Sequence, residues 1–288
     1  MSDTANQDYT HLVDTATLAA RLGAPDWVVF DCRFALADPA WGRDQYDRGH
    51  IPGARYAHLD EDLSSPIGPD TGRHPLPDPA SLCDKLGGWG VGQHTQVVVY
   101  DDAGGAFAVR LWWLLRWLGH PRAAVLDGGL GAWLARGGRL TSETPSIAPR
   151  TFNGLPDQSQ WLSTAAVEET LRTGAFQLVD ARAAERFRGE IEPIDPVAGH
   201  IPGAVNLPFA GNLSVDGTFL PPSVLRERLT AVLGDVAPER VVHSCGSGVN
   251  ACHNLLAMEV AGLHGSRIYA GSWSEWIRSP SRPVATGP

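Results

Sequence analysis

The apolar positions of this chain fall into short strand-like runs separated by helix-like segments. Runs typical of buried strands lie at residues 27–31, 97–101, 178–180 and 241–245. Residues 251–260 carry apolar side chains at helical spacing, as do residues 10–22. This alternation of strands and helices favours an α/β fold with a parallel sheet flanked by helices on both faces.

The same features occur twice, in the same order. Residues 49–54 and 199–204 both read Gly-His-Ile-Pro-Gly-Ala, and the strand-like runs repeat at nearly the same offset. Such a long repeat predicts a duplicated domain and not a solenoid, whose repeats are far shorter. Because both copies keep the histidine, we interpret His50 and His200 as structural.

The duplication sets the expected domain boundaries. We predict a first domain at residues 1–140 and a second at residues 159–288. Residues 141–158 are rich in Pro, Ser and Thr and lack periodicity, which indicates a linker.

Composition narrows the class of protein. The 288 residues include 43% hydrophobic residues, enough for two packed cores, and the net charge of -9 excludes nucleic acid as an expected partner. The four cysteines show no metal-ligand spacing, so we expect no metal and no cofactor. The polar residues 1–9 lack signal-peptide features, and no apolar run is long enough to span a membrane. We therefore expect a soluble, cytoplasmic, monomeric protein.

The candidate chemistry lies where the last strand-like run ends, at Cys245. Gly246 and Gly248 follow, and a helical pattern begins at Ala251. At such a junction, backbone N–H groups without helical acceptors can surround one centre, and the helix dipole stabilises a thiolate there. A buried core cysteine is the common alternative, but core packing needs no flanking glycines. We predict Cys245 as a nucleophile and place Cys252 in the helix core.

The loop Cys-Gly-Ser-Gly-Val-Asn-Ala at residues 245–251 resembles the active-site loop of rhodanese-type sulfurtransferases in their mercaptopyruvate form. The resemblance extends over residues 10–280 and includes both His-Ile-Pro-Gly-Ala turns and Gly-Ser-Trp-Ser-Glu-Trp at residues 271–276. It implies two tandem rhodanese-like domains. It also implies transfer of a sulfane sulfur from mercaptopyruvate to a thiol or cyanide through a persulfide on Cys245. Thiosulfate is the alternative donor, although thiosulfate-specific members tend to carry basic residues directly after the cysteine.

The resemblance also implies roles for other residues. The loop would hold the persulfide, a proton relay would protonate the leaving carbon, and arginines would bind the anionic donor. The residues that correspond to the persulfide-binding loop are Gly246, Gly248, Val249, Asn250 and Ala251. Those that correspond to the proton relay are Ser247, His74 and Asp62. The donor-binding arginine corresponds to Arg186, assisted by Arg188. Asn250 replaces the threonine usual in the family.

Two differences, one between the two copies and one between this chain and the family, modify these expectations. The first copy has Asp101 at the cysteine position, so we expect it to be catalytically silent and to form one wall of the substrate cleft. The family usually places a second donor arginine in the stretch that corresponds to residues 192–195, and this chain has none there. We therefore expect a raised KM for mercaptopyruvate.

Two other classes of protein share the loop architecture. Cysteine-dependent phosphatases need an arginine near the loop's end to clamp phosphate, and Val-Asn-Ala at residues 249–251 excludes them. A non-catalytic persulfide carrier or thiol redox sensor stays as an alternative. The sequence leaves the acceptor open among thioredoxin, glutathione and cyanide.

Overall fold

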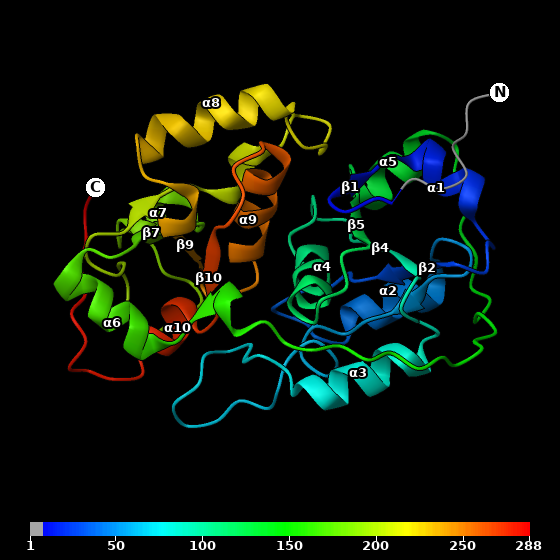
Figure 1. The fold of residues 1–288 in the computed structure, drawn as a ribbon, viewed down its shortest axis with the longest axis horizontal. Coiled ribbons are helices and arrows are strands. Elements are labelled where there is room, and N and C mark those ends of the chain that lie inside the picture. Colours follow the sequence, from blue (N-terminus) through cyan, green and yellow to red (C-terminus); the bar gives the residue numbers. More distant parts are fainter. Residues whose placement is uncertain (1–7) are drawn as a thin grey trace. The chain divides into compact units, whose positions relative to one another are not determined.

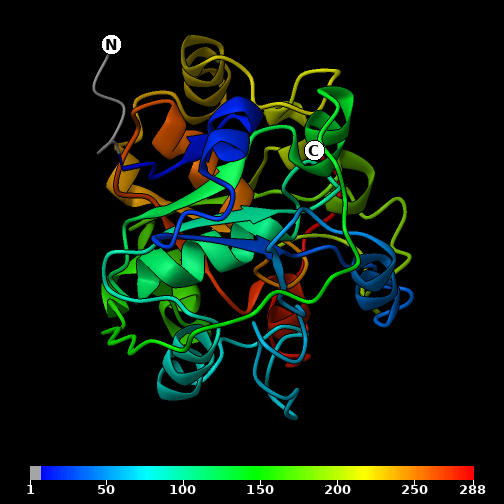
Figure 2. The same ribbon diagram turned by 90° about the vertical axis from the view of Figure 1, so that its right-hand side faces the viewer.

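The computed structural model describes residues 8–288, and the chain forms two compact units (Figures 1 and 2). The first unit comprises the chain up to residue 62 together with residues 78–156, and the second comprises residues 63–77 and 157–288. Most of the polar N-terminal stretch discussed above, residues 1–7, lies outside the described residues.

The first unit is built on a five-stranded sheet in the order β1-β5-β4-β2-β3, with every strand pair parallel. Its strands are β1 (Leu12–Val13), β2 (Trp27–Asp31), β3 (Arg55–Tyr56), β4 (Gln96–Tyr100) and β5 (Ala123–Leu126). Its helices are α1 (Thr15–Arg21), α2 (Trp41–Arg48), α3 (Pro79–Gly88), α4 (Ala108–Trp117) and α5 (Gly129–Ala135). Every residue of the central strand β4 is buried, as the continuous apolar run predicts.

The second unit repeats this arrangement, with a parallel sheet in the order β6-β10-β9-β7-β8. Its strands are β6 (Trp161–Leu162), β7 (Gln177–Asp180), β8 (Val205–Asn206), β9 (Val241–Ser244) and β10 (Arg267–Tyr269). Its helices are α6 (Thr164–Thr173), α7 (Ala184–Phe187), α8 (Pro222–Leu233), α9 (Ala251–Val260) and α10 (Ser272–Trp276), with short 3-10 turns at Gln158–Gln160, Phe209–Asn212 and Pro238–Arg240. The two sheets match strand for strand, which confirms the predicted duplicated α/β fold.

The first helix is shorter than the apolar pattern of residues 10–22 predicts. Residues 12 and 13 instead form the edge strand β1, which pairs with β5. Helix α1 begins at Thr15 because the Asp14 side chain accepts a hydrogen bond from the backbone N–H of Thr17 at 2.7 Å and so caps the helix.

The matched histidines have the structural role expected of them. His50 Nδ1 lies 2.8 Å from the carbonyl oxygen of Tyr46, and its ring stacks on the Tyr46 ring. In the second unit, His200 Nδ1 lies 2.7 Å from the carbonyl oxygen of Phe187, and the two rings also stack. Each histidine therefore ties the turn after its helix to that helix.

Residues 63–77 belong to the second unit, although their place in the sequence assigns them to the first domain. The backbone N–H of Gly72 donates to Glu275 Oε2 at 3.3 Å, and that of Arg73 donates to Ser274 Oγ at 3.1 Å. Arg278 Nε donates to the carbonyl oxygen of Thr71 at 2.9 Å. The cyan segment thus lies against α10 (Figure 1). Residues 141–156, the greater part of the predicted linker, group with the first unit.

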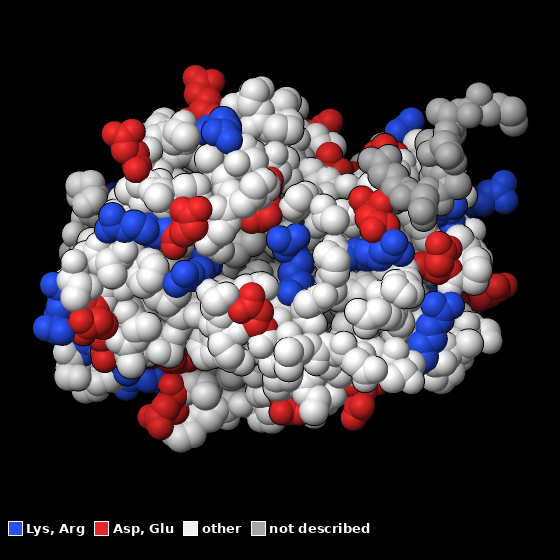
Figure 3. Space-filling view, viewed as in Figure 1, with Lys and Arg blue, Asp and Glu red and all other residues white. Residues whose placement is uncertain are grey.

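The surface carries charges of both signs. On the face drawn in Figure 3, lysine and arginine side chains are interspersed with acidic ones. No helix within residues 8–288 combines the length and apolar character needed to cross a lipid bilayer. The same residues contain no cluster of three or more His, Cys, Asp or Glu side chains suited to a metal ion.

Candidate active site

Cys245 lies at the carboxyl end of β9, the central strand of the second sheet. Its Sγ accepts a hydrogen bond from the backbone N–H of Gly248 at 3.2 Å, and the residue is only 3% exposed. The carbonyl oxygen of Cys245 accepts from the N–H of Trp273 at 3.0 Å. The sulfur is thus held at the edge of the sheet where ligands of parallel α/β folds bind.

Ser272 positions Cys245, the predicted nucleophile, and sequence reasoning missed this contact. Its Oγ accepts a hydrogen bond from the backbone N–H of Cys245 at 3.0 Å and donates to the carbonyl oxygen of Tyr269 at 2.9 Å. Ser272 has φ +50°, a left-handed conformation that costs about 1–3 kcal/mol in a residue other than glycine. The matched position of the first unit is Gly129, with φ +56° and no hydroxyl. The strained serine is therefore specific to the copy that carries the cysteine.

The loop after Cys245 is fixed by close packing. Gly248 has φ +81°, and a Cβ there would stand 2.1 Å from the carbonyl oxygen of Ala270. Val249 and Ala251 are buried at 4% and 0% exposure, and Asn250 begins α9 without a side-chain capping bond. The backbone amides near Cys245 therefore have little freedom to move.

The first unit shows what a loop of this kind binds. There the Asp101 carboxylate follows β4 and accepts four backbone N–H hydrogen bonds at 2.8–2.9 Å, from Ala103, Gly105, Phe107 and Ala108. The Asp101 carbonyl oxygen accepts from Leu130 N–H at 2.8 Å, as that of Cys245 accepts from Trp273. A loop between the central strand and its helix thus encloses an anion in this fold.

The predicted donor-binding arginine, Arg186, lies beside the loop. Both guanidinium Nη atoms are 3.9 Å from the point where a Cβ on Gly246 would stand. Arg186 Nη2 pairs with Glu192 Oε1 at 2.6 Å and with Asp195 Oδ2 at 3.2 Å. Burial alone would raise the pKa of Glu192, but hydrogen bonds from Arg186 and from two backbone N–H groups lower it below its usual value. Arg188, the suggested assistant, instead pairs with exposed Glu190 at 2.8 Å.

A second arginine at the loop was not anticipated from the sequence. Arg73 Nη2 lies 2.8 Å from the point where a Cβ on Gly246 would stand, and Nη1 pairs with Asp195. Burial raises the pKa of Asp195 above its usual value, although Arg73 and Arg186 both act to lower it. A lone arginine in an irregular segment of the other half of the sequence reads as a surface charge, so only the fold reveals this contact.

Two of the three predicted relay residues lie together. Ser247 Oγ is 2.7 Å from His74 Nδ1, and the two residues are 7% and 4% exposed. Asp62 belongs to the first unit, where its carboxylate accepts from the N–H of His58 at 2.9 Å and from Lys85 Nζ at 2.7 Å.

The other cysteines have different surroundings. Cys252 is wholly buried in α9, and its Sγ donates to the carbonyl oxygen of Gly248 at 3.4 Å. Burial, followed by the negative charge of Asp31, raises the pKa of the Cys32 thiol well above its usual value. Cys83 is half-buried, with its Sγ 3.9 Å from the carbonyl oxygen of Gly154.

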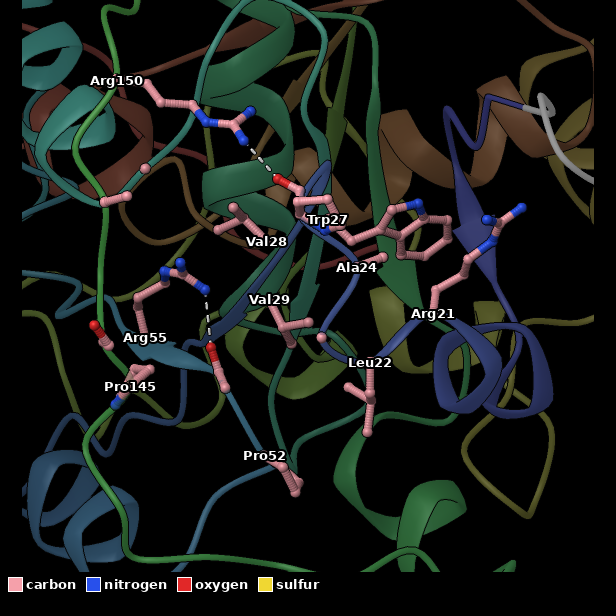
Figure 4. A pocket seen from close by; sticks show the side chains of 16 residues that line it. Arg21, Leu22, Ala24, Trp27, Val28, Val29, Pro52, Arg55, Pro145 and Arg150 are labelled. Atoms are coloured by element: carbon pink, nitrogen blue, oxygen red, sulfur yellow. Dashed lines mark hydrogen bonds between the residues drawn. The ribbon is translucent and has the colours of Figure 1, made fainter.

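A cavity of about 290 Å³ lies at the amino end of β2 in the first unit (Figure 4). Its lining contains no cysteine, histidine or carboxylate. Arg150 Nη2 donates to the carbonyl oxygen of Pro25 at 2.6 Å, and Arg55 Nη1 to that of Gly53 at 2.9 Å. This cavity therefore offers binding groups but no thiol, imidazole or carboxylate for catalysis, and the candidate active site is the loop at Cys245.

The chain is similar to known sulfurtransferases over nearly its whole length. A sequence profile of the rhodanese-like domain matches residues 14–136 and again 163–279. The chain is 54% identical to a probable 3-mercaptopyruvate sulfurtransferase of Pseudomonas aeruginosa, over 96% of this chain and 98% of that protein. It is 41% identical to a putative thiosulfate sulfurtransferase of Mycobacterium tuberculosis, over 96% and 97%. The 3-mercaptopyruvate sulfurtransferase of Leishmania major superimposes with a TM-score of 0.81 at 33% identity, over 93% of this chain and 74% of that one.

Proposed function

This chain belongs to the rhodanese family and is a sulfurtransferase, and we propose that it moves a sulfane sulfur from 3-mercaptopyruvate to a thiol or cyanide through a persulfide on Cys245. The observation that carries the choice of donor is the hydrogen-bonded pair of Ser247 Oγ and His74 Nδ1, which lie 2.7 Å apart. Ser247 is two residues after Cys245 in the loop. The pair can move a proton, which mercaptopyruvate requires on release of its carbon skeleton and thiosulfate does not.

The first half-reaction balances in electrons and protons. The Cys245 thiolate attacks the donor sulfur, an S–S bond forms, and the bond between that sulfur and C3 breaks with its electron pair left on C3. The resulting enolate takes up one proton and leaves as pyruvate. The donor thiol gives up one proton, so Ser247 and His74 need only pass it to C3. Asp62 remains a predicted third member of this relay.

The persulfide is a charged intermediate that the loop must stabilise. Gly248 already donates its N–H to the sulfur of Cys245, and the remaining amides up to Ala251 begin a helix. Preorganised N–H groups stabilise an anion without reorganising during the reaction. The Asp101 carboxylate, held by four amides in the first unit, supports this role for the matched loop.

In the second half-reaction an acceptor removes the outer sulfur. A thiol such as thioredoxin or glutathione, or cyanide, attacks that sulfur and regenerates the Cys245 thiolate, which gives ping-pong kinetics. All four cysteines are free, and Cys245 must be reduced before each turnover. We infer a reducing, cytoplasmic location on these grounds. A monomeric enzyme stays a prediction from the sequence.

Thiosulfate is the second candidate donor, favoured by the relative from Mycobacterium tuberculosis whose name specifies it. Within the loop itself, Gly246 and Ser247 offer no full positive charge to a dianion. We expect kcat/KM to be higher for mercaptopyruvate than for thiosulfate, as measured by pyruvate release and by thiocyanate formation with cyanide. A higher value for thiosulfate would overturn the proposed donor. Absence of pyruvate release and of thiocyanate would instead support a sulfur carrier or redox sensor.

Replacing Ser247 by alanine is expected to reduce the mercaptopyruvate reaction more than the thiosulfate reaction. General acid–base catalysis contributes about 10²–10⁴-fold, and only the mercaptopyruvate reaction needs a proton on carbon. The measurement is kcat for both donors with cyanide as acceptor. Ser244→Ala is the matched control, because Ser244 is also buried but its Oγ donates to the carbonyl oxygen of Val179 within the sheet. Equal losses with both donors in Ser247→Ala would contradict the relay.

A further inference from the structure

The cavity at the amino end of β2 gathers arginine side chains but no carboxylate. Its lining includes Arg55, which follows the Pro-Gly turn of the first unit, and Arg150, which lies in the segment of residues 141–156. Figure 4 shows these two side chains on the same side of the cavity, beside Val28 and Val29. Two positive charges therefore stand at one small cavity, although the net charge of the chain is -9.

Both guanidinium groups are held by uncharged acceptors and keep free N–H donors. Arg55 Nε and Nη1 donate to the carbonyl oxygens of Trp89 and Gly53, both at 2.9 Å. Arg150 Nη2 donates to a backbone carbonyl oxygen at 2.6 Å, and Nη1 to Thr95 Oγ1 at 3.3 Å. Within residues 8–288, no acceptor engages Arg55 Nη2 or Arg150 Nε, and no acidic side chain pairs with either arginine.

The two charges lie close enough to repel each other. Burial, together with the charge of Arg150, lowers the pKa of Arg55 from its usual value. Both groups nevertheless stay protonated at neutral pH. Arg55 Nη2 lies 3.5 Å from the point where a Cβ on Gly90 would stand, and Gly90 lines the cavity. An anion bound there would offset the repulsion and gain charge-assisted hydrogen bonds.

The second unit supplies an internal comparison. A cavity of about 260 Å³ lies at the amino end of β7, beside the matching Pro-Gly turn. There Gln177 Nε2 donates to the carbonyl oxygen of Gly203 at 3.0 Å, as Arg55 does to the matching carbonyl of the first unit. The position that matches Arg55 is Val205. A neutral amide is thus sufficient to hold this turn, so the fold does not require the positive charge of Arg55.

We propose that the cavity at β2 binds a small organic acid, whose carboxylate pairs with Arg55 and Arg150 and whose carbon skeleton lies on the apolar wall. A guanidinium fork matches the two oxygens of a carboxylate. The volume of about 290 Å³ is near the lower end for ligand pockets, which are mostly apolar with a few polar groups. An inorganic anion would leave the apolar wall uncovered. That wall is formed by Leu22, Val28, Val29, Pro52 and Pro145.

A purely structural role is the competing explanation, since both arginines also anchor backbone carbonyl groups. Arg240→Gln, in the cavity of the second unit, is the matched control. Arg240 Nε donates to the carbonyl oxygen of Ala175 at 3.0 Å, and Nη2 to that of Gly174 at 2.7 Å. Its replacement removes the same charge and the same kind of anchor. A variant that only loosens a turn should therefore resemble Arg240→Gln.

The test titrates the full-length wild type, Arg55→Gln, Arg150→Gln and Arg240→Gln with phenylacetate, with binding followed by ligand-observed NMR. Phenylacetate has an apolar ring and one carboxylate, and it carries no sulfur to transfer. We expect wild type to bind phenylacetate more tightly than its neutral amide, phenylacetamide. The affinity should fall about 10- to 100-fold in Arg55→Gln and in Arg150→Gln, as expected for one lost charged hydrogen bond. Arg240→Gln should match wild type.

Three outcomes would overturn the inference. Equal phenylacetate affinity in wild type, Arg55→Gln and Arg150→Gln would place any binding elsewhere on the chain. Phenylacetamide or inorganic phosphate bound as tightly as phenylacetate would exclude a site for organic acids. An equal loss in Arg240→Gln would indicate a structural effect. Melting temperatures without ligand monitor folding, and Arg150→Gln alone decides the test if Arg55→Gln is unstable.

Sulfur transfer is measured separately, because binding at this cavity involves no step at Cys245. Arg55→Gln and Arg150→Gln should keep the wild-type kcat and KM with mercaptopyruvate and cyanide. If wild type transfers no sulfur, the proposed function fails while the phenylacetate titration still decides the role of the cavity. Loss of sulfur transfer in folded Arg55→Gln, without a change in phenylacetate affinity, would contradict the inference.

Discussion

Cys245→Ser is expected to abolish sulfur transfer, lowering kcat by about 10⁴-fold or more as for loss of other covalent nucleophiles. A serine hydroxyl cannot take up a sulfane sulfur, while the amide of Gly248 and the Ser272 contact stay in place. The measurements are pyruvate release and mass spectrometry of the enzyme after addition of donor. Wild type should gain one sulfur on the Cys245 peptide, and the variant should gain none.

The matched controls are the other three cysteines. Cys32 and Cys252 are buried, Cys83 packs against a backbone carbonyl, and burial raises the pKa of the Cys32 thiol. Serine or alanine at each of these positions should leave activity largely intact. A persulfide found on Cys252 rather than on Cys245 would show that the wrong thiol has been assigned.

Gly248→Ala is expected to lower kcat/KM about 10²–10³-fold, the usual effect of losing one donor from an anion-stabilising site. The added methyl group would meet the carbonyl oxygen of Ala270 at 2.1 Å, so the loop must shift. That shift moves the N–H that donates to Cys245 Sγ. The measurements are steady-state kinetics and the yield of persulfide after a single addition of donor.

Gly203→Ala separates the effect of the clash from that of backbone strain. Gly203 has φ +77°, close to the value of +81° at Gly248, but a Cβ there would meet nothing within 4 Å. Alanine in either position costs roughly 1–2 kcal/mol of stability through its left-handed backbone. Only Gly248→Ala should lose activity. Equal activity of the two variants would mean that the Gly248 amide is not needed for transfer.

Local patterns were sufficient to predict the central strands and to single out Cys245 as the candidate nucleophile. The runs at residues 27–31 and 241–245 are apolar because central parallel strands are buried on both faces, and both form strands as expected. Cys245 was identifiable because its glycines and the following helix are its neighbours in the sequence. Apolar patterns predicted the ends of elements less reliably. The pattern placed the first helix at residues 10–22, but α1 begins at Thr15 because the Asp14 side chain caps it there.

The contacts between distant segments at the candidate site could not be predicted from local patterns. Arg73 and Asp195 form an ion pair between distant parts of the chain, and no periodic pattern in the sequence predicts it. The contact of Ser272 with Cys245 depends on a left-handed backbone conformation at Ser272. A charged side chain in an irregular segment has the same local sequence whether it lies in solvent or over a nucleophile. The arrangement of Arg73 beside Gly246 therefore became visible only in the fold.

The sequence by itself determined the duplicated α/β fold, and it singled out Cys245 and its copy of the domain as the candidates for the chemistry. These depend on burial of strands and on residues adjacent in the chain, and both leave a local record in residue type and spacing. The tertiary structure alone decided that residues 63–77 join the second unit and place His74 against Ser247 and Arg73 beside Gly246. The physical reason is that hydrogen bonds and ion pairs between distant segments depend on how the chain folds back on itself, and short-range patterns carry no information about that.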